Sequence, residues 1–182
     1  MKTFVLTVPL LGLPLLTACA VFGRGAPPAP LDTVPWVDLD RYLGTWYEIA
    51  RLPTWFEKGC VATSATYEKM ERGRIRVINR CRKGTLDGKV KEARGVAWVV
   101  DANTNAKLKV RFFWPFSGDY WILELDPDYR WAMVGDPSRD YLWILRRTPR
   151  MDEETYRDLV ARARAKGFEV NRLERPEQPF GD

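Results

Sequence analysis

Residues 44–60 have the sequence GTWYEIARLPTWFEKGC, and the first eight of them show the alternation of a β-strand. Because successive side chains of a strand point to opposite faces, Glu48 lies on the same face as Trp46 and Ala50. A Trp on the inner face predicts a buried core, in which a carboxylate must be paired, hydrated or protonated. We therefore expect Glu48 to lie low in a partly polar cavity, with an Arg, Tyr or Trp as its partner. A local bulge that turns Glu48 to solvent is the alternative.

Seven further runs rich in Val, Ile, Tyr, Trp and Phe follow this stretch. Short segments with Gly, Asn or Pro separate the runs, and these residues favour tight turns. Short links between neighbours predict antiparallel hairpins, because parallel strands need a long crossover. The eight predicted strands span residues 45–52, 61–69, 74–81, 90–100, 106–113, 120–125, 131–135 and 141–147.

Eight consecutive antiparallel strands predict an all-β fold, an up-and-down barrel, because closure removes both sheet edges. Such a barrel is just wide enough to be filled by side chains or to hold one small ligand. An open sandwich fits the same strand pattern. Residues 151–167 have apolar side chains at helical spacing, acids in the first turn and bases in the last, which predicts one C-terminal α-helix packed outside the barrel. Residues 168–173 are a candidate ninth strand.

The N-terminus has the plan of a secretory signal peptide. Lys2 precedes an apolar run that is too short to span a bilayer, and small residues lead to Cys19. Residues 16–19, LTAC, resemble the lipobox of bacterial lipoproteins, which implies that Cys19 becomes the lipidated N-terminus. Ala20 in the next position implies sorting to the outer membrane. The predicted parts are a signal peptide (1–18), a lipidated Cys and flexible tether (19–37), a barrel with its helix (38–175) and a tail (176–182).

The chain carries 29 Lys and Arg, 24 Asp and Glu, and no His, for a formal charge of +5. The absence of His excludes a Ser-His-Asp triad, a Cys-His pair and a His-bearing zinc site. We predict no cofactor and no metal site. Export removes nucleic acid as a partner of the basic surface and leaves anionic headgroups or plain solvent. One basic group is either an interaction patch or a solvated hairpin: Arg72, Arg74, Arg80, Arg82 and Lys83.

With Cys19 lipidated, Cys60 and Cys81 are the remaining pair in an oxidising compartment. A turn near residues 71–73 puts them at matching ends of one hairpin, so we expect a disulfide. Two free buried thiols are the alternative.

Three short motifs resemble, in the right order, the signatures of lipocalins. Gly44-Thr45-Trp46 resembles the G-x-W motif, and Asp128-Tyr129 matches the D-Y of the second motif, with Pro127 in place of its Thr. Arg147 matches the Arg that lies over the Trp in that family. The phrases RYLGTWYEIARLP, NAKLKV, GDYWILELD and DYLWILRRTP are similar to bacterial outer-membrane lipocalins, relatives of apolipoprotein D. The resemblance implies a lipid-anchored barrel that faces the periplasm and binds a fatty acid or lysophospholipid.

Alternation also predicts which side chains meet a ligand. If Arg147 covers Trp46, then Trp143 lies on the inner face of the last strand. In the sixth strand we expect Tyr120 and Ile122 inside, and the opposite phase is the alternative. The predicted ligand-binding residues are Trp143, Tyr120, Ile122, Glu48, and, near the mouth, Trp98 and Phe113. For each aromatic residue, plain packing in the floor of the barrel is the alternative.

The leading functional hypothesis is non-catalytic uptake of a lipid for storage, transport or membrane maintenance, with no enzymatic activity. An enzyme that uses Cys60 or Cys81 inside the barrel is a second hypothesis. A third is an envelope scaffold whose barrel is filled by its own side chains.

Overall fold

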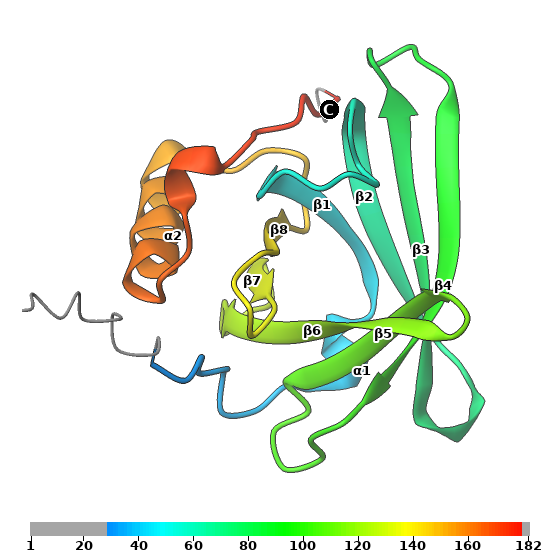
Figure 1. The fold of residues 1–182 in the computed structure, drawn as a ribbon, viewed down its shortest axis with the longest axis vertical. Coiled ribbons are helices and arrows are strands. Elements are labelled where there is room, and N and C mark those ends of the chain that lie inside the picture. The colour runs from blue at the N-terminus through cyan, green and yellow to red at the C-terminus, as the bar shows by residue number, and fades with distance from the viewer. Residues whose placement is uncertain (1–28, 180–182) are drawn as a thin grey trace, which may run out of the picture.

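Eight antiparallel strands close into one barrel in the computed structural model, which describes residues 29–179 (Figure 1). Each strand pairs with the next along the chain, and the last pairs with the first, so the barrel is closed. This confirms the predicted barrel and rules out the open sandwich. The strands are β1 (Gly44–Arg51), β2 (Cys60–Lys69), β3 (Arg74–Lys83), β4 (Val90–Val99), β5 (Lys107–Phe113), β6 (Phe116–Leu125), β7 (Trp131–Gly135) and β8 (Leu142–Arg146).

Helix α2 (Glu153–Ala165) packs outside the barrel, beside β7 and β8, as Figure 1 shows. Its first turn is capped by Asp152, whose carboxylate accepts from the Thr155 amide, and Gly167 follows its end with φ +87°. A shorter helix, α1 (Leu39–Tyr42), was not predicted and is capped by Asp38. Two short 3₁₀ turns complete the described elements, η1 (Glu71–Gly73) and η2 (Val170–Arg172).

Two hydrophobic clusters stabilise the fold, one on each face of the sheet. The inner cluster fills the closed half of the barrel and includes Trp46, Tyr67, Ile122, Val134 and Leu145. The outer cluster lies between the outer face of the sheet and α2, and includes Leu123, Met133, Ile144, Leu159 and Ala163. Inner and outer side chains alternate along the strands, which is the pattern that the sequence predicted.

The barrel has two different ends, because successive loops of an up-and-down barrel alternate between them. At the closed end, α1 and residues 31–37 cover the opening. The Val37 amide donates to Thr104 O and the Asp38 amide donates to Tyr129 Oη. We call the other end the mouth; its loops are 52–59 (β1–β2), 84–89 (β3–β4), 114–115 (β5–β6) and 136–141 (β7–β8).

Part of the predicted tether is packed against the barrel. Leu31 and Val37 are buried, and the Val34 amide donates to Ile122 O at 3.0 Å. The prediction of a flexible tether is therefore wrong for residues 31–37, because three apolar side chains hold this segment to the sheet. Cys19 and the predicted signal peptide lie outside the described residues.

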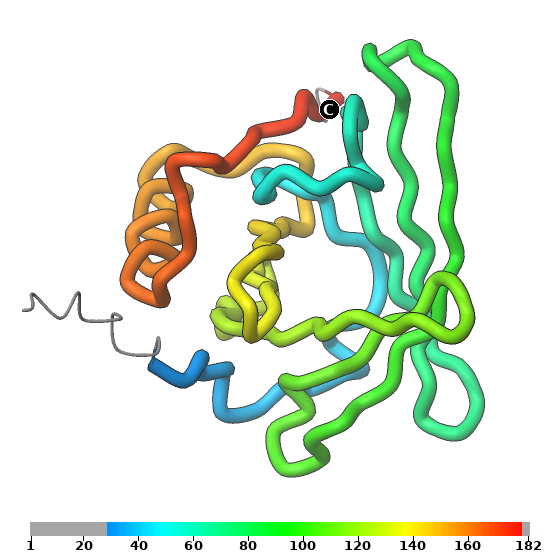
Figure 2. Tube along the Cα trace, viewed as in Figure 1, coloured from blue at the N-terminus to red at the C-terminus, as the bar shows by residue number. Residues whose placement is uncertain are grey.

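The C-terminal tail closes a gap in the wall of the barrel. β1 and β2 pair only over Gly44–Tyr47, and farther up the two strands separate. The tail runs from α2 across this gap (Figure 2), where Glu174 pairs with Arg51 and the Ala62 amide donates to Glu177 O. The Gln178 side chain donates to Glu48 O and Thr63 O, one on each strand. The predicted ninth strand at 168–173 is wrong: this segment forms a 3₁₀ turn, and the tail after it meets β1.

Candidate ligand-binding site in the barrel

The floor of the barrel is built around Trp46. This residue is fully buried, and the Arg147 guanidinium lies 3.8 Å from the centre of its ring. Arg147 also donates to Thr45 O at 3.1 Å and to Arg41 O at 2.7 Å. Gly44 has φ +93°, and a Cβ there would lie 3.4 Å from an Arg147 nitrogen, so this position favours glycine. The three predicted motif positions thus meet at the closed end, where they hold the fold together.

A layer of three tyrosines lies above the floor. The Tyr120 hydroxyl hydrogen-bonds to Tyr42 Oη and accepts from Tyr67 Oη, both at 2.8 Å. Burial raises the pKa of all three hydroxyls, so they are neutral donors and acceptors. The layer packs directly on the floor, because the ring centre of Tyr42 lies 4.9 Å from that of Trp46.

Glu48 lies inside the barrel, 3 % exposed, as alternation predicted. Its carboxylate accepts a hydrogen bond from Arg51 Nη1, so the predicted Arg partner is confirmed. A bulge between Glu48 and Ala50 shifts the register, and this shift puts Arg51 on the inner side and Ala50 in the outer cluster. The prediction for Ala50 is therefore wrong, because the strand contains one residue more than strict alternation allows.

A second carboxylate, Glu57, is also buried near Glu48. It comes from loop 52–59, accepts from Thr54 Oγ1 at 2.9 Å and from Trp143 Nε1 at 3.3 Å. Burial raises the pKa of Glu48 well above its ordinary value, Glu57 raises it further, and Arg51 partly offsets both. Arg51 is paired with Glu48 and, at 3.4 Å, with Glu174, whereas the Glu57 carboxylate adds a second negative charge near Glu48 without an ion pair to Arg51. Sequence reasoning missed Glu57, since no strand pattern extends into this loop.

The predicted inner phase of β6 and β8 is correct. Tyr120 and Ile122 belong to the inner cluster, whereas Trp121 and Leu123 pack in the outer one. Trp143 also lines the interior, half-buried, with its ring stacked on Tyr141 at 5.9 Å.

Two other predicted pocket residues are placed differently. Trp98 lies outside the inner cluster and near the closed end, where Arg111 approaches its ring at 5.6 Å. Its neighbour Ala97 takes the inner position. The phase of the strand, and not the size of the side chain, therefore decides which of the two residues faces the interior. Phe113 is at the mouth but 73 % exposed, and Phe112 packs against the inner cluster instead. Phe112 continues the inner alternation of Leu108 and Val110, so Phe113 falls on the opposite face.

Loop 52–59 lies across the mouth. The Cys60–Cys81 disulfide, which confirms the predicted pairing, fixes the end of the loop to β3. Lys91 Nζ donates to Phe56 O at 2.9 Å, and the Phe56 ring stacks on Tyr141 on the opposite side. The loop is thereby held from both sides of the opening.

Several buried polar atoms near the mouth have no hydrogen-bond partner within residues 29–179. They are Arg51 Nε, Thr63 Oγ1 and Asn79 Oδ1, from the neighbouring strands β1, β2 and β3. Alternation from Val77 places Asn79 on the inner face, and Thr63 lies at the register shift of β2 between Val61 and Ser64. Buried polar groups are normally satisfied, so these atoms indicate room for water or for a polar group of a ligand.

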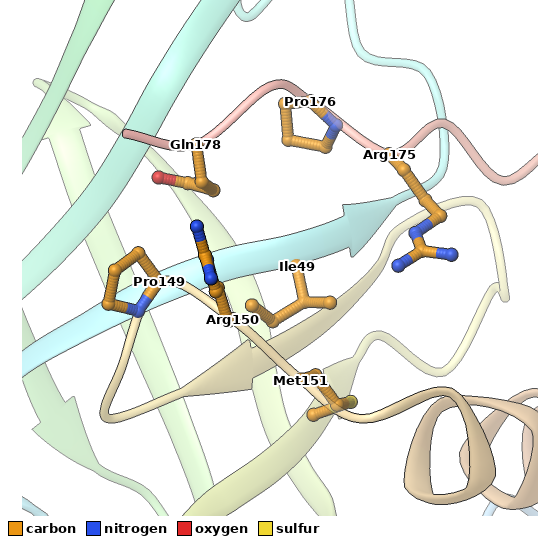
Figure 3. Close-up of a pocket in the computed structure, with 7 residues that line it drawn as sticks. All are labelled: Ile49, Pro149, Arg150, Met151, Arg175, Pro176 and Gln178. Carbon is orange, nitrogen blue, oxygen red and sulfur yellow. The ribbon is translucent and has the colours of Figure 1, made fainter. Parts of the chain in front are cut away.

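Two further hollows lie outside the barrel interior. One of about 260 Å³ lies between β1, the segment after β8 and the tail, and Figure 3 shows Ile49, Arg150 and Gln178 around it. The other lies against the β2–β3 hairpin at the closed end. The predicted basic patch is not one surface: Arg72 and Arg74 lie at the closed end, Arg82 and Lys83 at the mouth, and Arg80 pairs with Glu92 between them.

The sequence over residues 37–178 matches the family described as a lipocalin-like domain. The chain belongs to the lipocalin family. It is 41 % identical over 165 residues to the outer membrane lipoprotein Blc of Escherichia coli, covering 91 % of each chain. It is also 41 % identical over 157 residues to temperature-induced lipocalin-1 of Arabidopsis thaliana, covering 81 % of this chain and 83 % of that one.

Solved structures of other lipocalins share the fold at low sequence identity. Insecticyanin from the tobacco hornworm superposes with a TM-score of 0.65 at 18 % identity, covering 85 % of this chain and 89 % of that one. Apocrustacyanin C2 gives a TM-score of 0.63 at 15 % identity, over 79 % and 81 % of the two chains. Within residues 29–179, no helix has the length and apolar character needed to cross a membrane.

Proposed function

We propose that this lipocalin is anchored to the outer membrane by lipid on Cys19 and binds a fatty acid or lysophospholipid inside its barrel. The observation that carries the proposal is the character of the interior between the tyrosine layer and the mouth. Trp143, Tyr120 and Phe112 belong to the inner face there, yet each is only partly buried, unlike the floor residues. An inner wall that is apolar and still accessible suits an acyl chain, at about 25 cal/mol for each Å² removed from water.

The polar groups of the site suit a headgroup that stays near the mouth. Arg51, Thr63 and Asn79 offer polar atoms without partners among the described residues, and Glu48 and Glu57 lie beside them. The acyl chain then extends downward past Trp143 toward Tyr120 and Ile122. In this proposal Trp98 and Phe113 have no part in the pocket.

The relatives support the membrane location. Several are named outer membrane lipoproteins, and this chain aligns with them over about nine tenths of its length. Residues 16–19 supply the lipobox that such anchoring requires, and Ala20 fits sorting to the outer membrane. We propose that the barrel then faces the periplasm.

Catalysis by a cysteine is disfavoured by one specific contact. A thiolate is the nucleophile in such enzymes, and the sulfurs of Cys60 and Cys81 are bonded to each other. Binding without chemistry therefore remains the function that the geometry supports best.

Native mass spectrometry tests the proposal. A chain of residues 20–182 is purified from the periplasm and examined for a bound fatty acid or lysophospholipid. We expect a co-purified lipid that is lost, or bound at least about ten-fold more weakly, when Trp143 is replaced by Ala. The Trp98→Ala variant is the matched control, because this Trp lies outside the inner cluster, and it should retain the lipid.

A protein that carries no lipid, and whose Trp fluorescence does not change when fatty acid or lysophospholipid is added, would contradict the proposal. That result would favour the envelope scaffold with a filled barrel.

A further inference from the structure

Four large aromatic side chains at the mouth are exposed to solvent. Trp55 in loop 52–59 is 81 % exposed, and Phe113, Trp114 and Phe116 at the tip of the β5–β6 hairpin are 73 %, 81 % and 77 % exposed. Large aromatic side chains are normally buried for most of their surface, and a group of exposed ones marks an interaction site. Neither the inner nor the outer cluster includes any of the four.

Basic side chains lie at the same end of the barrel. The loop 52–59 and the β3–β4 hairpin carry the exposed residues Lys58, Arg82, Lys83, Lys89 and Lys91. None of these forms an ion pair with another described residue, and the acid among them is Asp87 at the hairpin tip. Glu92 is nearby but is already engaged by Arg80 and Arg94. Arg82, Lys83 and Lys91 donate to backbone oxygens only. The mouth thus combines exposed aromatic rings with cations whose charge is not neutralised by an ion pair within residues 29–179.

The fourth loop of the mouth is different. Loop 136–141 contains Asp136 and Asp140 and no strongly exposed aromatic side chain, and its one base, Arg139, is half-buried and donates to Lys166 O and Ala29 O. The exposed aromatic and basic side chains therefore lie on the other three loops, which gives the surface a defined orientation. At the closed end the corresponding exposed aromatic residue is Trp36, 57 % exposed, and its surroundings include Asp38 and Asp40.

The chain also enters the described structure on the mouth side. Arg139, in loop 136–141, donates from Nη2 to Ala29 O. Ten positions separate Ala29 from Cys19. They span at most about 33 Å when fully extended. If Cys19 is lipidated as proposed above, the link to the anchor leaves the described structure at Ala29, beside a loop of the mouth.

We propose that the mouth of the barrel docks on an anionic phospholipid surface. Trp and Phe side chains suit the boundary between headgroups and acyl chains, and Lys and Arg are attracted to anionic headgroups. Trp55 and the β5–β6 tip enter this boundary, while the basic side chains of the β3–β4 hairpin lie on the headgroups. For the function proposed above, docking would let a lipid pass between bilayer and barrel without crossing water; the docking itself does not depend on which ligand is bound.

Vesicle co-sedimentation tests the docking surface without the lipid anchor. The chain of residues 20–182 is suitable, because residues 29–179 contain the whole barrel, both hydrophobic clusters and the disulfide. We expect it to bind vesicles of phosphatidylethanolamine and phosphatidylglycerol, and to bind phosphatidylcholine vesicles much more weakly. The double variant Trp55→Ser/Trp114→Ser should partition about a hundred-fold more weakly, since each exposed Trp contributes about ten-fold.

Trp36→Ser is the matched control, because it removes an exposed Trp from the closed end, and it should bind like the wild type. A second variant, Lys58→Gln/Lys89→Gln, should lose the preference for anionic vesicles while keeping the fold, which circular dichroism checks.

The proposal is overturned if the wild type does not bind anionic vesicles, or if Trp55→Ser/Trp114→Ser binds them as well as Trp36→Ser does. A wild type that ignores vesicles but forms a dimer that the double variant abolishes would also overturn it, and would assign the surface to contact between copies. The vesicles contain neither fatty acid nor lysophospholipid, so failure here is distinct from failure of the ligand proposal.

Discussion

At the closed end of the barrel, Trp46 is fully buried and the Arg147 guanidinium above it donates to backbone oxygens. At the mouth, by contrast, the carboxylates of Glu48 and Glu57 are buried close to each other, several polar atoms lack partners among residues 29–179, and aromatic rings are exposed. At the closed end, the large apolar side chain is buried and the guanidinium is hydrogen-bonded, which stabilises the fold. At the mouth, buried charges, polar atoms without partners among the described residues and exposed rings each cost stability. Such features are expected where a protein binds something, because a fully satisfied interior leaves nothing for a ligand to contact.

The largest expected effect comes from the floor. Replacing Trp46 by Ala leaves a cavity under the inner cluster, and we expect the free energy of unfolding to fall by about 3–5 kcal/mol. Chemical denaturation measures this loss. Trp36→Ala, at the same end but exposed, should change it by no more than about 0.5 kcal/mol. Equal losses in the two variants would show that the closed end is not organised around Trp46.

The next effect comes from the mouth. The Cys60–Cys81 disulfide joins residues 21 apart, and replacing both by Ser should lower the free energy of unfolding by about 3 kcal/mol. Hydrogen exchange adds the location: amides of loop 52–59 should exchange faster, while those of Gly44–Tyr47 in β1 stay protected. Uniform acceleration over both regions would mean that the two ends are not independently stabilised.

A smaller effect distinguishes Arg147, which follows β8, from its neighbour Arg146. Lys in place of Arg147 keeps the charge but loses the fork that reaches several carbonyls, and we expect a loss of roughly 1–3 kcal/mol in thermal or chemical unfolding. Arg146 points outward to Asp152, so Arg146→Lys should cost less than about 0.5 kcal/mol. If both variants lost the same amount, the position over Trp46 would have no special role.

The smallest effect is the dependence on pH. Because burial raises the pKa of Glu48, the folded state favours the protonated carboxyl; its contribution to stability is present below the ordinary value of 4.5 and is lost as the pH rises toward the folded-state value. The wild type should therefore lose stability relative to Glu48→Gln as the pH is raised from 4 to 8, which chemical denaturation at a series of pH values measures.

The pKa of Glu92 is shifted in the opposite direction from that of Glu48. Its pKa is lowered by hydrogen bonds from Arg80 and Arg94, so its contribution is present above the ordinary value and is lost as the pH falls. If the difference in the free energy of unfolding between the wild type and Glu48→Gln stayed the same at every pH, the raised pKa of Glu48 would be contradicted.

The closed end was also the part that the sequence predicted best. Turn residues between short apolar runs define the hairpins, and Gly44, Trp46 and Arg147 are recognisable because their structural role demands particular residue types. Period-two alternation then places Glu48, Tyr120 and Trp143 correctly, as long as no residue interrupts the ladder.

The mouth was predicted less well because shifts of register accumulate toward it. The shift after Glu48 moves Arg51 to the inner side, and further shifts lie between Val61 and Ser64 and between Val110 and Phe113. No local pattern marks such shifts, since they depend on how neighbouring strands pair. Glu57 lies in a loop, where burial is decided by tertiary contacts with Thr54 and Trp143.

The tail that links β1 to β2 has a consequence for how the protein is made. A ribosome completes all eight strands before it adds Gln178, whose side chain ties Glu48 O to Thr63 O. The wall of the barrel is therefore sealed only by a segment that follows all eight strands, so a chain that has not yet reached Gln178 holds an open seam between its first two strands.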